Sequence, residues 1–226
     1  MGFINMIQKI GYLFVKHFGT FINALGKTVE ITVLSLIFAT IIGIIFGLFK
    51  ISKKKPLELI ANFYISIIRG TPLMVQILFI FFGFPAILGF KWNMMTACVV
   101  IMSINAGAYM TELIRGGIEA VDRGQMEAAR SLGLSYGKAM AKVILPQAMR
   151  IMLPSIINQF IMTLKDTSLL SVIGMRELTQ NTKIIVANNM ESFAMYFIVG
   201  VYYWVIVTIL SKVAKWLERR TSYANK

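Results

Sequence analysis

The sequence predicts an all-α protein that crosses a lipid bilayer several times, and three observations support this fold class. Hydrophobic residues make up 57% of the 226 residues and charged residues 15%, with a mean hydropathy of +0.72. A soluble domain is about half apolar and about a quarter charged, so this chain has too few polar side chains for a water-facing surface. The other two observations are long windows without charged residues and an uneven distribution of Lys and Arg.

The composition also argues against several classes of function. One cysteine (Cys98) and one histidine (His17) leave almost nothing for a disulfide framework, a metal cluster or a Cys/His nucleophile. The pattern G-x-x-x-x-G-K-[ST], the usual nucleotide phosphate loop, does not occur in the sequence. A net charge of +13 in a membrane chain reports topology rather than nucleic-acid binding. The sequence therefore predicts no enzyme activity, no metal site, no cofactor in this chain and no nucleic-acid partner.

Residues 1–27 predict an amphipathic helix that lies in the outer membrane interface. Its apolar stripe consists of Met6, Ile10, Leu13, Phe14 and Phe21. Its polar side consists of Asn5, Gln8, Lys9, Tyr12 and Lys16. A cleaved signal peptide is the alternative, but the segment lacks a compact apolar core followed by a small-residue cleavage site.

Windows without Asp, Glu, Lys or Arg predict the membrane spans. Four windows of 19 to 21 residues each reach about 30 Å as a helix, which matches the hydrocarbon core of a bilayer. They are residues 31–49, 70–90, 92–111 and 192–211. A fifth window, 151–164, has only 14 residues, and the span obtained by extending it back to Val143 contains Pro146, Arg150 and Pro154. Because an Arg near a helix end can reach the interface, that extension is physically allowed.

The basic residues decide between four spans and five. With five spans, the loop 50–58, the loop 112–142 with Arg150, and the tail from Lys212 share one side and carry 15 of the 23 Lys and Arg residues. The positive-inside rule makes that side cytoplasmic, with the N-terminus outside and the C-terminus inside. The predicted organisation is an interfacial helix (1–27), a transmembrane domain (28–212) and a basic cytoplasmic tail (213–226).

The loop between the third and fourth spans is predicted to form a helical hairpin. Asp122 followed by Gln125 has the spacing of a capping box, and Gly133 suits the C′ position that ends the first helix. Ser135 can cap a second helix, which Pro146 ends or bends.

The first helix of this hairpin carries a small, smooth face. Its members are Ala128, Ala129 and Leu132. Such a face suits insertion into a groove on a partner protein, although a plain cytoplasmic hairpin explains the pattern equally well.

One motif in this loop carries a resemblance to a known family. Glu127-Ala128-Ala129, Gly133 after three further residues, and Val143-Ile144-Leu145-Pro146 after nine more resemble the EAA loop of ABC-importer permeases. The family has Ile where this chain has Val143, which keeps the β-branched bulk. The resemblance implies a coupling loop over about 122–146 that contacts a separate ATPase. It implies contact through Gln125, Glu127, Ala128, Ala129, Ser131, Leu132 and Gly133.

Other segments resemble the polar amino-acid permeases for histidine/lysine/arginine, glutamine and cystine. The similar segments are 69–76, 106–117, 124–125 and 165–169, within a resemblance that runs from about residue 20 to 212. The resemblance implies a type I ABC-importer transmembrane domain in the bacterial cytoplasmic (inner) membrane that moves a polar amino acid by alternating access. It also implies two ABC ATPase copies holding ATP and Mg, an extracellular or periplasmic amino-acid-binding protein, and a second permease copy, with a homodimer favoured over a heterodimer.

Two rival functions remain open at this point. A self-sufficient secondary transporter or channel would move solute without an ATPase, but it gives no reason for a docking loop with this spacing. A non-transporting membrane assembly subunit would show no substrate-dependent ATP turnover together with its partner.

The segment Arg69-Gly70-Thr71-Pro72 predicts a polar hinge. Pro72 removes a backbone hydrogen bond and biases Thr71 away from the helix, so a bend is expected close to the cytoplasmic mouth. Arg69 could instead reach from a helix end to the interface. Lys165 and Asp166, at the outer end of the fourth span, predict either a local ion pair or a gate element.

Polar residues inside the spans are the candidates for a substrate pathway, because a zwitterion needs hydrogen-bond donors and acceptors and buried polar groups avoid lipid. Asn105, Tyr109 and Glu112 have i, i+4, i+7 spacing and share one helix face. The predicted pathway residues are Gln76, Asn105, Tyr109, Asn158 and Gln159. The alternative is that these amides only join helices to one another.

Overall fold

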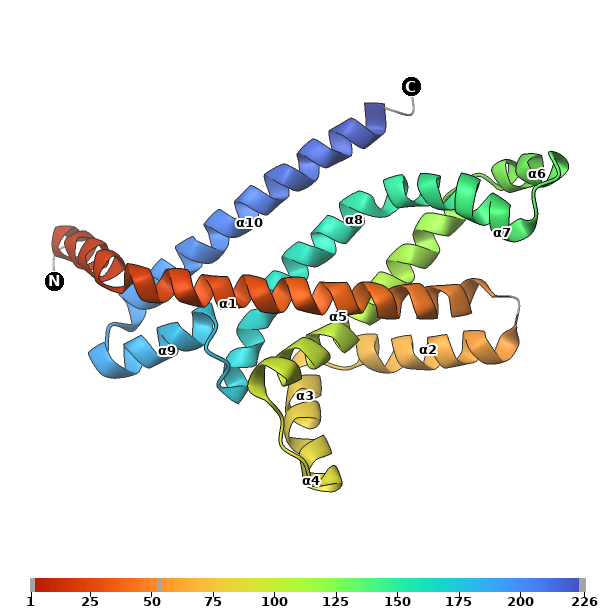
Figure 1. Ribbon diagram of the computed structural model, residues 1–226. Coiled ribbons are helices and arrows are strands. Elements are labelled where there is room, and N and C mark those ends of the chain that lie inside the picture. The colour runs from red at the N-terminus through yellow and green to blue at the C-terminus, as the bar shows by residue number, and fades with distance from the viewer. Residues whose placement is uncertain (1–2, 53, 224–226) are drawn as a thin grey trace. The chain divides into compact units, whose positions relative to one another are not determined.

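The structure is a computed structural model that describes residues 3–52 and 54–223. The first two residues of the predicted interfacial helix, Lys53, and the last three residues of the predicted tail lie outside the described residues. All regular elements in the described part are helices (Figure 1). Four of them are long and apolar enough to cross a membrane, and one broken pair makes a fifth candidate if it counts as one span.

The chain folds into two compact units, each built from three stretches of sequence. Unit 1 contains the described residues up to 36 together with 72–102 and 160–210. Unit 2 contains 37–71, 103–159 and the described residues from 211 onward. All three segments predicted to be cytoplasmic belong to unit 2, whereas the N-terminal segment and the loop 165–191, both predicted to be outside, belong to unit 1. The segments predicted to share a side therefore cluster together.

The first helix, α1, runs without interruption over Phe3–Ile51, so residues 1–27 do not form a separate element. Its predicted apolar stripe is the buried face, with Leu13 and Phe21 at 5% and 0% exposure. The stripe packs against α9 (Leu178–Asn189) and α10 (Ser192–Tyr223), so protein side chains cover it. The periodicity located the buried face, but it could not show that protein would cover that face.

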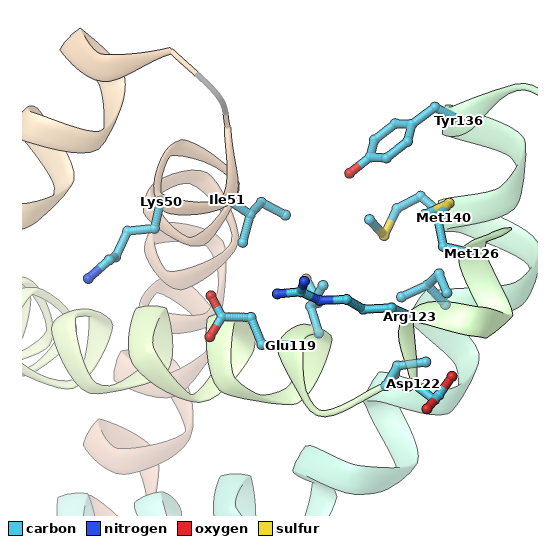
Figure 2. Close-up of a pocket in the computed structure, with 11 residues that line it drawn as sticks. Lys50, Ile51, Glu119, Asp122, Arg123, Met126, Tyr136 and Met140 are labelled. Atoms are coloured by element: carbon cyan, nitrogen blue, oxygen red, sulfur yellow. The ribbon is translucent and has the colours of Figure 1, made fainter.

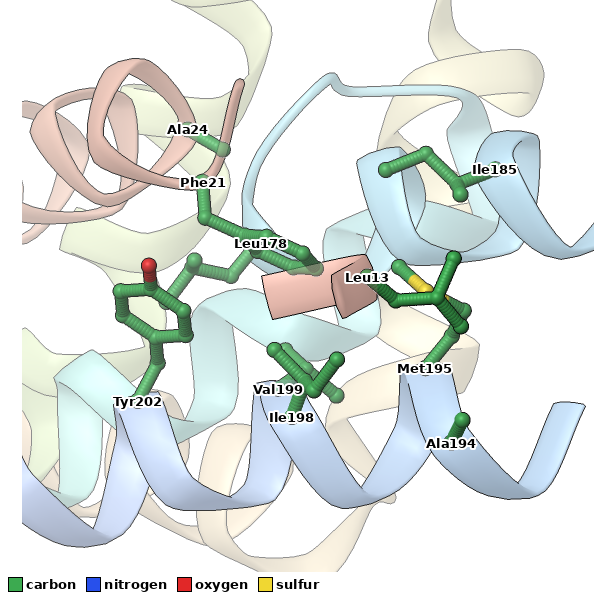
Figure 3. Packing of buried hydrophobic residues seen from close by; sticks show 10 residues of the cluster. All are labelled: Leu13, Phe21, Ala24, Leu178, Ile185, Ala194, Met195, Ile198, Val199 and Tyr202. Carbon is green, nitrogen blue, oxygen red and sulfur yellow. The ribbon is translucent and has the colours of Figure 1, made fainter. Parts of the chain in front are cut away.

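Figure 3 shows the core that these helices form in unit 1. Tyr202 of α10 stacks on Phe21 and Phe14 of α1, with ring centroids 5.0 and 5.7 Å apart. Lys9 of α1 also forms an ion pair with Glu191, just before α10. Beyond residue 212, α10 continues as a helix to Tyr223, so the basic tail is helical as far as the structure describes it.

The predicted span 70–90 is not one continuous helix with a loop before it. A helix α2 (Lys55–Gly70) already fills most of the predicted loop, and the chain is extended at Thr71 and Pro72. Helix α3 (Leu73–Leu78) then passes through a π-helical turn (Phe79–Gly83) into α4 (Phe84–Leu88). Charged residues at the start of α2 interrupt the charge-free windows, which is why this helix was not predicted.

Unit 2 contains a tight crossing between α1 and α5 (Met94–Glu119). A Cβ atom added at Gly43 of α1 would lie 2.6 Å from the Cβ of Met110 on α5. A Cβ added at Gly107 of α5 would lie 2.7 Å from Ile42 and 2.9 Å from the hydroxyl of Tyr64. Glycines therefore bring these backbones together, as small residues do in membrane helix pairs.

Tyr64 connects α2 to this helix pair. Its hydroxyl donates a hydrogen bond to the carbonyl of Ile104 at 2.6 Å, and its ring stacks on Phe46 of α1 at 4.4 Å. The parts of α1, α2 and α5 that belong to unit 2 therefore pack as one group.

The predicted hairpin is present as α6 (Arg123–Ser131) and α7 (Tyr136–Ala139). Pro146 does not end the second helix, because α7 continues through a π-helical turn (Met140–Ile144) into α8 (Leu145–Asp166). Proline cannot donate a backbone hydrogen bond and its ring crowds the preceding turn, and a widened π turn accommodates both effects.

Candidate functional site: a coupling hairpin and a membrane pathway

The first turn of α6 is fixed by Asp122, as its capping pattern predicted. The Asp122 carboxylate accepts a hydrogen bond from the backbone N–H of Gly124 at 2.7 Å. The other half of the predicted capping box is not formed. The side-chain oxygen of Gln125 instead accepts a hydrogen bond at 3.3 Å from Gln147 on α8, which ties the hairpin to that helix.

The end of α6 is a Schellman turn centred on Gly133. The Leu134 N–H donates to the carbonyl of Ala129 at 3.2 Å, and the Gly133 N–H donates to that of Arg130 at 3.0 Å. Gly133 has a φ of +84°, the left-handed conformation that glycine adopts without steric cost. This confirms that Gly133 is the residue that ends the first helix.

The predicted smooth face of α6 is divided between its two sides. Leu132 is 84% exposed and Ala128 is also exposed, but Ala129 is only 4% exposed. Adjacent helix residues point about 100° apart, so Ala128 and Ala129 cannot share one narrow face. The outward surface of the hairpin therefore carries Glu127, Ala128, Ser131 and Leu132, whereas Ala129 packs inward.

An apolar cluster holds the hairpin on the membrane part of unit 2. Ile114 and Val121, at the end of α5 and just after it, pack with Ile144, Ala148 and Met152 from the π turn and α8. Met126 of α6 packs against the same cluster. A displacement of α6 would therefore pass directly to α5 and α8.

An ionic network joins the C-terminal end of α1 to the C-terminal part of α5. Glu112 accepts from Lys50 of α1 at 3.0 Å and from Arg115 at 2.9 Å, and Arg115 also pairs with Glu119. The Lys50 and Glu112 side chains are 19% and 20% exposed, so solvent screens this pair only partly. Lys50 and Arg115 were not identified from the sequence. The i, i+3, i+7 spacing of Glu112, Arg115 and Glu119 could have indicated the contacts within α5. Lys50 could not be found in this way, because it lies 62 residues from Glu112 in the sequence.

Replacing Glu112 with Gln is expected to destabilise the protein by about 1–3 kcal/mol, because it leaves Lys50 without its partner in a half-buried position. Glu30→Gln removes one partner of an exposed pair with Lys27, whose side chains are 52% and 45% exposed, and should change stability by less than about 0.5 kcal/mol. Thermal unfolding in detergent measures both variants. Equal losses of stability in the two variants would show that the Glu112 network stabilises the protein no more than an exposed ion pair does.

A cavity of about 700 Å³ lies beside the hairpin (Figure 2). Its walls come from the ends of α1 and α5 and from α6, α7 and the π turn. Figure 2 shows Lys50 and Glu119 on one side of this space and Met126, Tyr136 and Met140 on the other. The space separates part of the hairpin from the end of α1, which leaves room for the hairpin to move.

The structure changes the expected depth of Arg69. Arg69 lies in the last turn of α2, a full helix away from the loop between α1 and α2, and its guanidinium lies 5.3 Å from the ring centroid of Tyr109. The extended backbone at Thr71 supports the predicted hinge. Arg69 therefore lies one helix further from the loop around residue 53 than the sequence indicated, because α2 was not predicted.

The five predicted pathway residues differ in exposure. Gln76, Asn105 and Gln159 are 7%, 7% and 6% exposed, and each is engaged in an interaction. Tyr109 is half-buried and Asn158 is exposed. Asn105, Tyr109, Asn158 and Gln159 all belong to unit 2, whereas Gln76 belongs to unit 1. Burial of the three amides matches the alternative in which such side chains join helices.

Lys165 and Asp166 do not form the local ion pair that was one of the two expectations. No ion pair joins them among the described residues; Lys165 is exposed and Asp166 is half-buried. Consecutive helix residues point in different directions, which explains why the two charges do not meet.

A buried carboxylate in unit 1 was also missed. Glu177 is 0% exposed and caps α9 by accepting from the N–H groups of Thr179 and Gln180 at 2.8 and 2.7 Å. Tyr203 of α10 donates to the same carboxylate at 3.0 Å. Burial raises the pKa of Glu177, and these hydrogen bonds oppose that rise. Glu177 therefore fixes the start of α9 against α10. The sequence signal for this cap was Gln180, which lies three residues after Glu177, the spacing of a capping box.

Comparison with known proteins gives consistent matches over most of the chain. Residues 39–223 match the family model described as the binding-protein-dependent transport system inner membrane component. The chain is 40% identical over 199 residues to the arginine transport system permease protein ArtQ of Bacillus subtilis, covering 88% of this chain and 91% of that protein. It is 37% identical over 193 residues to a putative glutamine transport system permease protein of Rickettsia felis, covering 85% and 88%.

A solved structure gives the same result at the level of the fold. The crystal structure of an amino acid ABC transporter with histidines contains a chain that is 41% identical to this one, with a TM-score of 0.87. The match covers 92% of this chain and 97% of that chain. The helix order described above is therefore the architecture of an ABC-importer transmembrane domain.

Proposed function

Because this chain belongs to the binding-protein-dependent transport system inner membrane component family, we propose that it is the permease subunit of an ABC importer for a polar amino acid. Its relatives include permeases named for arginine and glutamine transport, which supports a polar amino acid as the cargo. The apolar helices and the family description place the chain in the bacterial inner membrane as a multi-pass protein.

The observation that carries the proposed mechanism is the outward surface of α6. A leucine that is 84% exposed stands beside a small alanine, next to a turn that only glycine forms without strain. A leucine exposed at the turn of a short hairpin can fill a pocket on a partner protein and so anchor the hairpin there. We therefore propose that two copies of a separate ATPase, which bind ATP and Mg, grip α6 through Leu132, Ala128, Ser131 and Glu127.

The contacts of unit 2 supply a route for force from the hairpin into the membrane. Movement of α6 reaches α5 and α8 through the cluster around Ile114 and Met152, and α1 through the pair between Lys50 and Glu112. Closure of the ATPase dimer would draw two such hairpins together and tilt the helices that carry them. Rigid-body rocking of this kind is a common route to alternating access.

The complete importer is proposed to contain three further parts. A second copy of this chain forms the other half of the pathway, as a homodimer in preference to a heterodimer. The two ATPase subunits lie on the cytoplasmic side. An extracellular or periplasmic amino-acid-binding protein delivers the substrate to the opposite side, with the N-terminus of this chain outside and its C-terminus inside.

Substrate-stimulated ATP hydrolysis tests this function and identifies the cargo. The chain, its ATPase and its binding protein are reconstituted in nanodiscs, and the ATPase rate is measured with each amino acid in turn. We expect one or a few polar amino acids to raise the rate severalfold, while apolar amino acids leave it at the basal level. Equal rates with every amino acid would contradict the proposal and favour a non-transporting assembly subunit.

A further inference from the structure

Arg69 is an arginine at membrane depth whose charge has no counter-ion in the described part of the chain. Its guanidinium lies 5.3 Å from the ring centroid of Tyr109, and no carboxylate lies within ion-pair distance of it among the described residues. Both residues belong to unit 2, so their contact lies within one compact unit.

The depth of this pair follows from the helix that carries Tyr109. Helix α5 has 26 residues, and ten of them follow Tyr109, which places Tyr109 about 15 Å from the end of the helix. The hydrocarbon core of a bilayer is about 30 Å thick, and the charge-free window 92–111 ends two residues after Tyr109, so the pair lies inside the core, toward the end that Glu112 marks. Arg69 is also about 21 Å along α2 from Lys55, so it lies far from the loop that precedes this helix.

The carboxylates of unit 2 whose side chains the structure describes are committed elsewhere. Glu112 and Glu119 pair with Lys50 and Arg115, and Asp122 caps α6. Glu58 lies in the first turn of α2 and Glu127 lies on the exposed surface of α6. Within the described residues the guanidinium also donates no hydrogen bond to the last carbonyls of α2, so its role is not that of a helix cap.

The surroundings of Arg69 are open. Arg69 is exposed, and a Cβ added at the adjacent Gly70 would meet no atom within 4 Å. A charged side chain facing hydrocarbon is costly, so this surface must face water or another polar group. The Tyr109 ring makes a cation–π contact with the guanidinium, whose N–H groups form no ion pair with a carboxylate among the described residues.

We infer that Arg69, supported by Tyr109, is the subsite that receives the α-carboxylate of the transported amino acid. This inference rests on the proposed function and adds the chemical group that the pathway recognises. A guanidinium binds a carboxylate through two parallel N–H···O hydrogen bonds, which is stronger and more directional than a single neutral hydrogen bond. Every free amino acid carries this group, so the subsite selects for the class, and other residues select the side chain.

The test is direct binding to the complex of permease and ATPase without the binding protein, because a protein that binds amino acids would also bind these probes. The probes are L-arginine, L-glutamine and L-histidine, each compared with its α-carboxamide. The wild-type complex should bind at least one acid about tenfold or more tightly than its amide, a difference expected for a charge-assisted hydrogen-bond pair. In Arg69→Gln this preference should fall below about threefold.

Three further variants separate the roles of the Arg69 charge, the hydrogen-bond geometry of its guanidinium and the contact with the Tyr109 ring. Arg69→Lys keeps the positive charge but cannot form two parallel hydrogen bonds to one carboxylate. This variant should bind the acid more weakly while still preferring it to the amide. Tyr109→Phe keeps the aromatic face and should match the wild type, whereas Tyr109→Leu should weaken acid binding. Arg150→Gln is the matched control: it removes an exposed arginine and should leave the preference unchanged.

Two outcomes would overturn the inference alone. One is equal binding of acid and amide by the wild-type complex, which needs no variant and so does not depend on whether Arg69→Gln folds. The other is an Arg69→Gln complex that assembles with the ATPase and retains the full preference. If the wild-type complex neither binds nor imports any of these amino acids, the proposed function fails together with the inference.

Discussion

Replacing Gly133 with Asp is expected to reduce substrate-stimulated ATP hydrolysis of the reconstituted complex to its basal rate. Gly133 has a φ of +84°, where a residue with a Cβ atom costs about 1–2 kcal/mol, and Asp tolerates this conformation better than most residues. A Cβ at this position meets no atom of the chain within 4 Å. The chain should therefore fold, and the new charge should fall on the surface that the ATPase grips.

Gly137→Asp is the matched control for this prediction. Gly137 belongs to the same hairpin, is exposed and would also have open space around an added Cβ, but its φ is not positive. That variant adds the same charge away from the Schellman turn and should keep most of the stimulation. Full stimulation in Gly133→Asp, with normal insertion and assembly, would remove the basis for assigning the hairpin as the docking element.

Replacing Gly43 with Leu is expected to disrupt the packing of unit 2. A Cβ at Gly43 would lie 2.6 Å from the Cβ of Met110, 3.0 Å from its carbonyl carbon and 3.2 Å from the backbone nitrogen of Thr111. Backbone atoms cannot move aside as a side-chain tip can, so α1 and α5 must separate. We expect a loss of at least about 3 kcal/mol, the upper range for overpacking. A chain of this size should then unfold at least about 6 °C lower.

Gly200→Leu provides the comparison for the Gly43 variant. Gly200 also lies within a long apolar helix, α10, but a Cβ there meets nothing within 4 Å. That variant should unfold within about 2 °C of the wild type, because no packed neighbour must move. Thermal unfolding in detergent, followed by size-exclusion chromatography, measures both. An unchanged midpoint for Gly43→Leu would contradict the close crossing of α1 and α5.

The features predicted correctly from the sequence are those that depend on local chemistry. Gly133 ends α6 because the requirement for a left-handed residue is set within one turn of the helix. Asp122 begins α6 for a similar reason, since its carboxylate reaches a backbone N–H two residues away. The spacing from Glu127 to Pro146 likewise located the hairpin without knowledge of the surrounding fold.

The features predicted incorrectly depend on contacts between distant segments or on helix phase. Charges at Lys54, Lys55 and Glu58 made the start of α2 look like a loop, which displaced the expected position of Arg69. Ala129 faces the rest of the chain and Ala128 faces outward, a choice that the pattern of alanines does not determine. The pair between Lys50 and Glu112 joins residues far apart in the sequence. No local pattern specifies such a pair.

Uptake of a labelled amino acid by sealed vesicles tests most directly whether this chain is a passive gate driven by a separate ATPase. Vesicles that contain the chain alone are compared with vesicles that contain the chain, its ATPase and its binding protein, with ATP on the side of the ATPase. The account predicts uptake only in the complete vesicles and only with ATP. Uptake by the chain alone at a comparable rate under an ion gradient would contradict it.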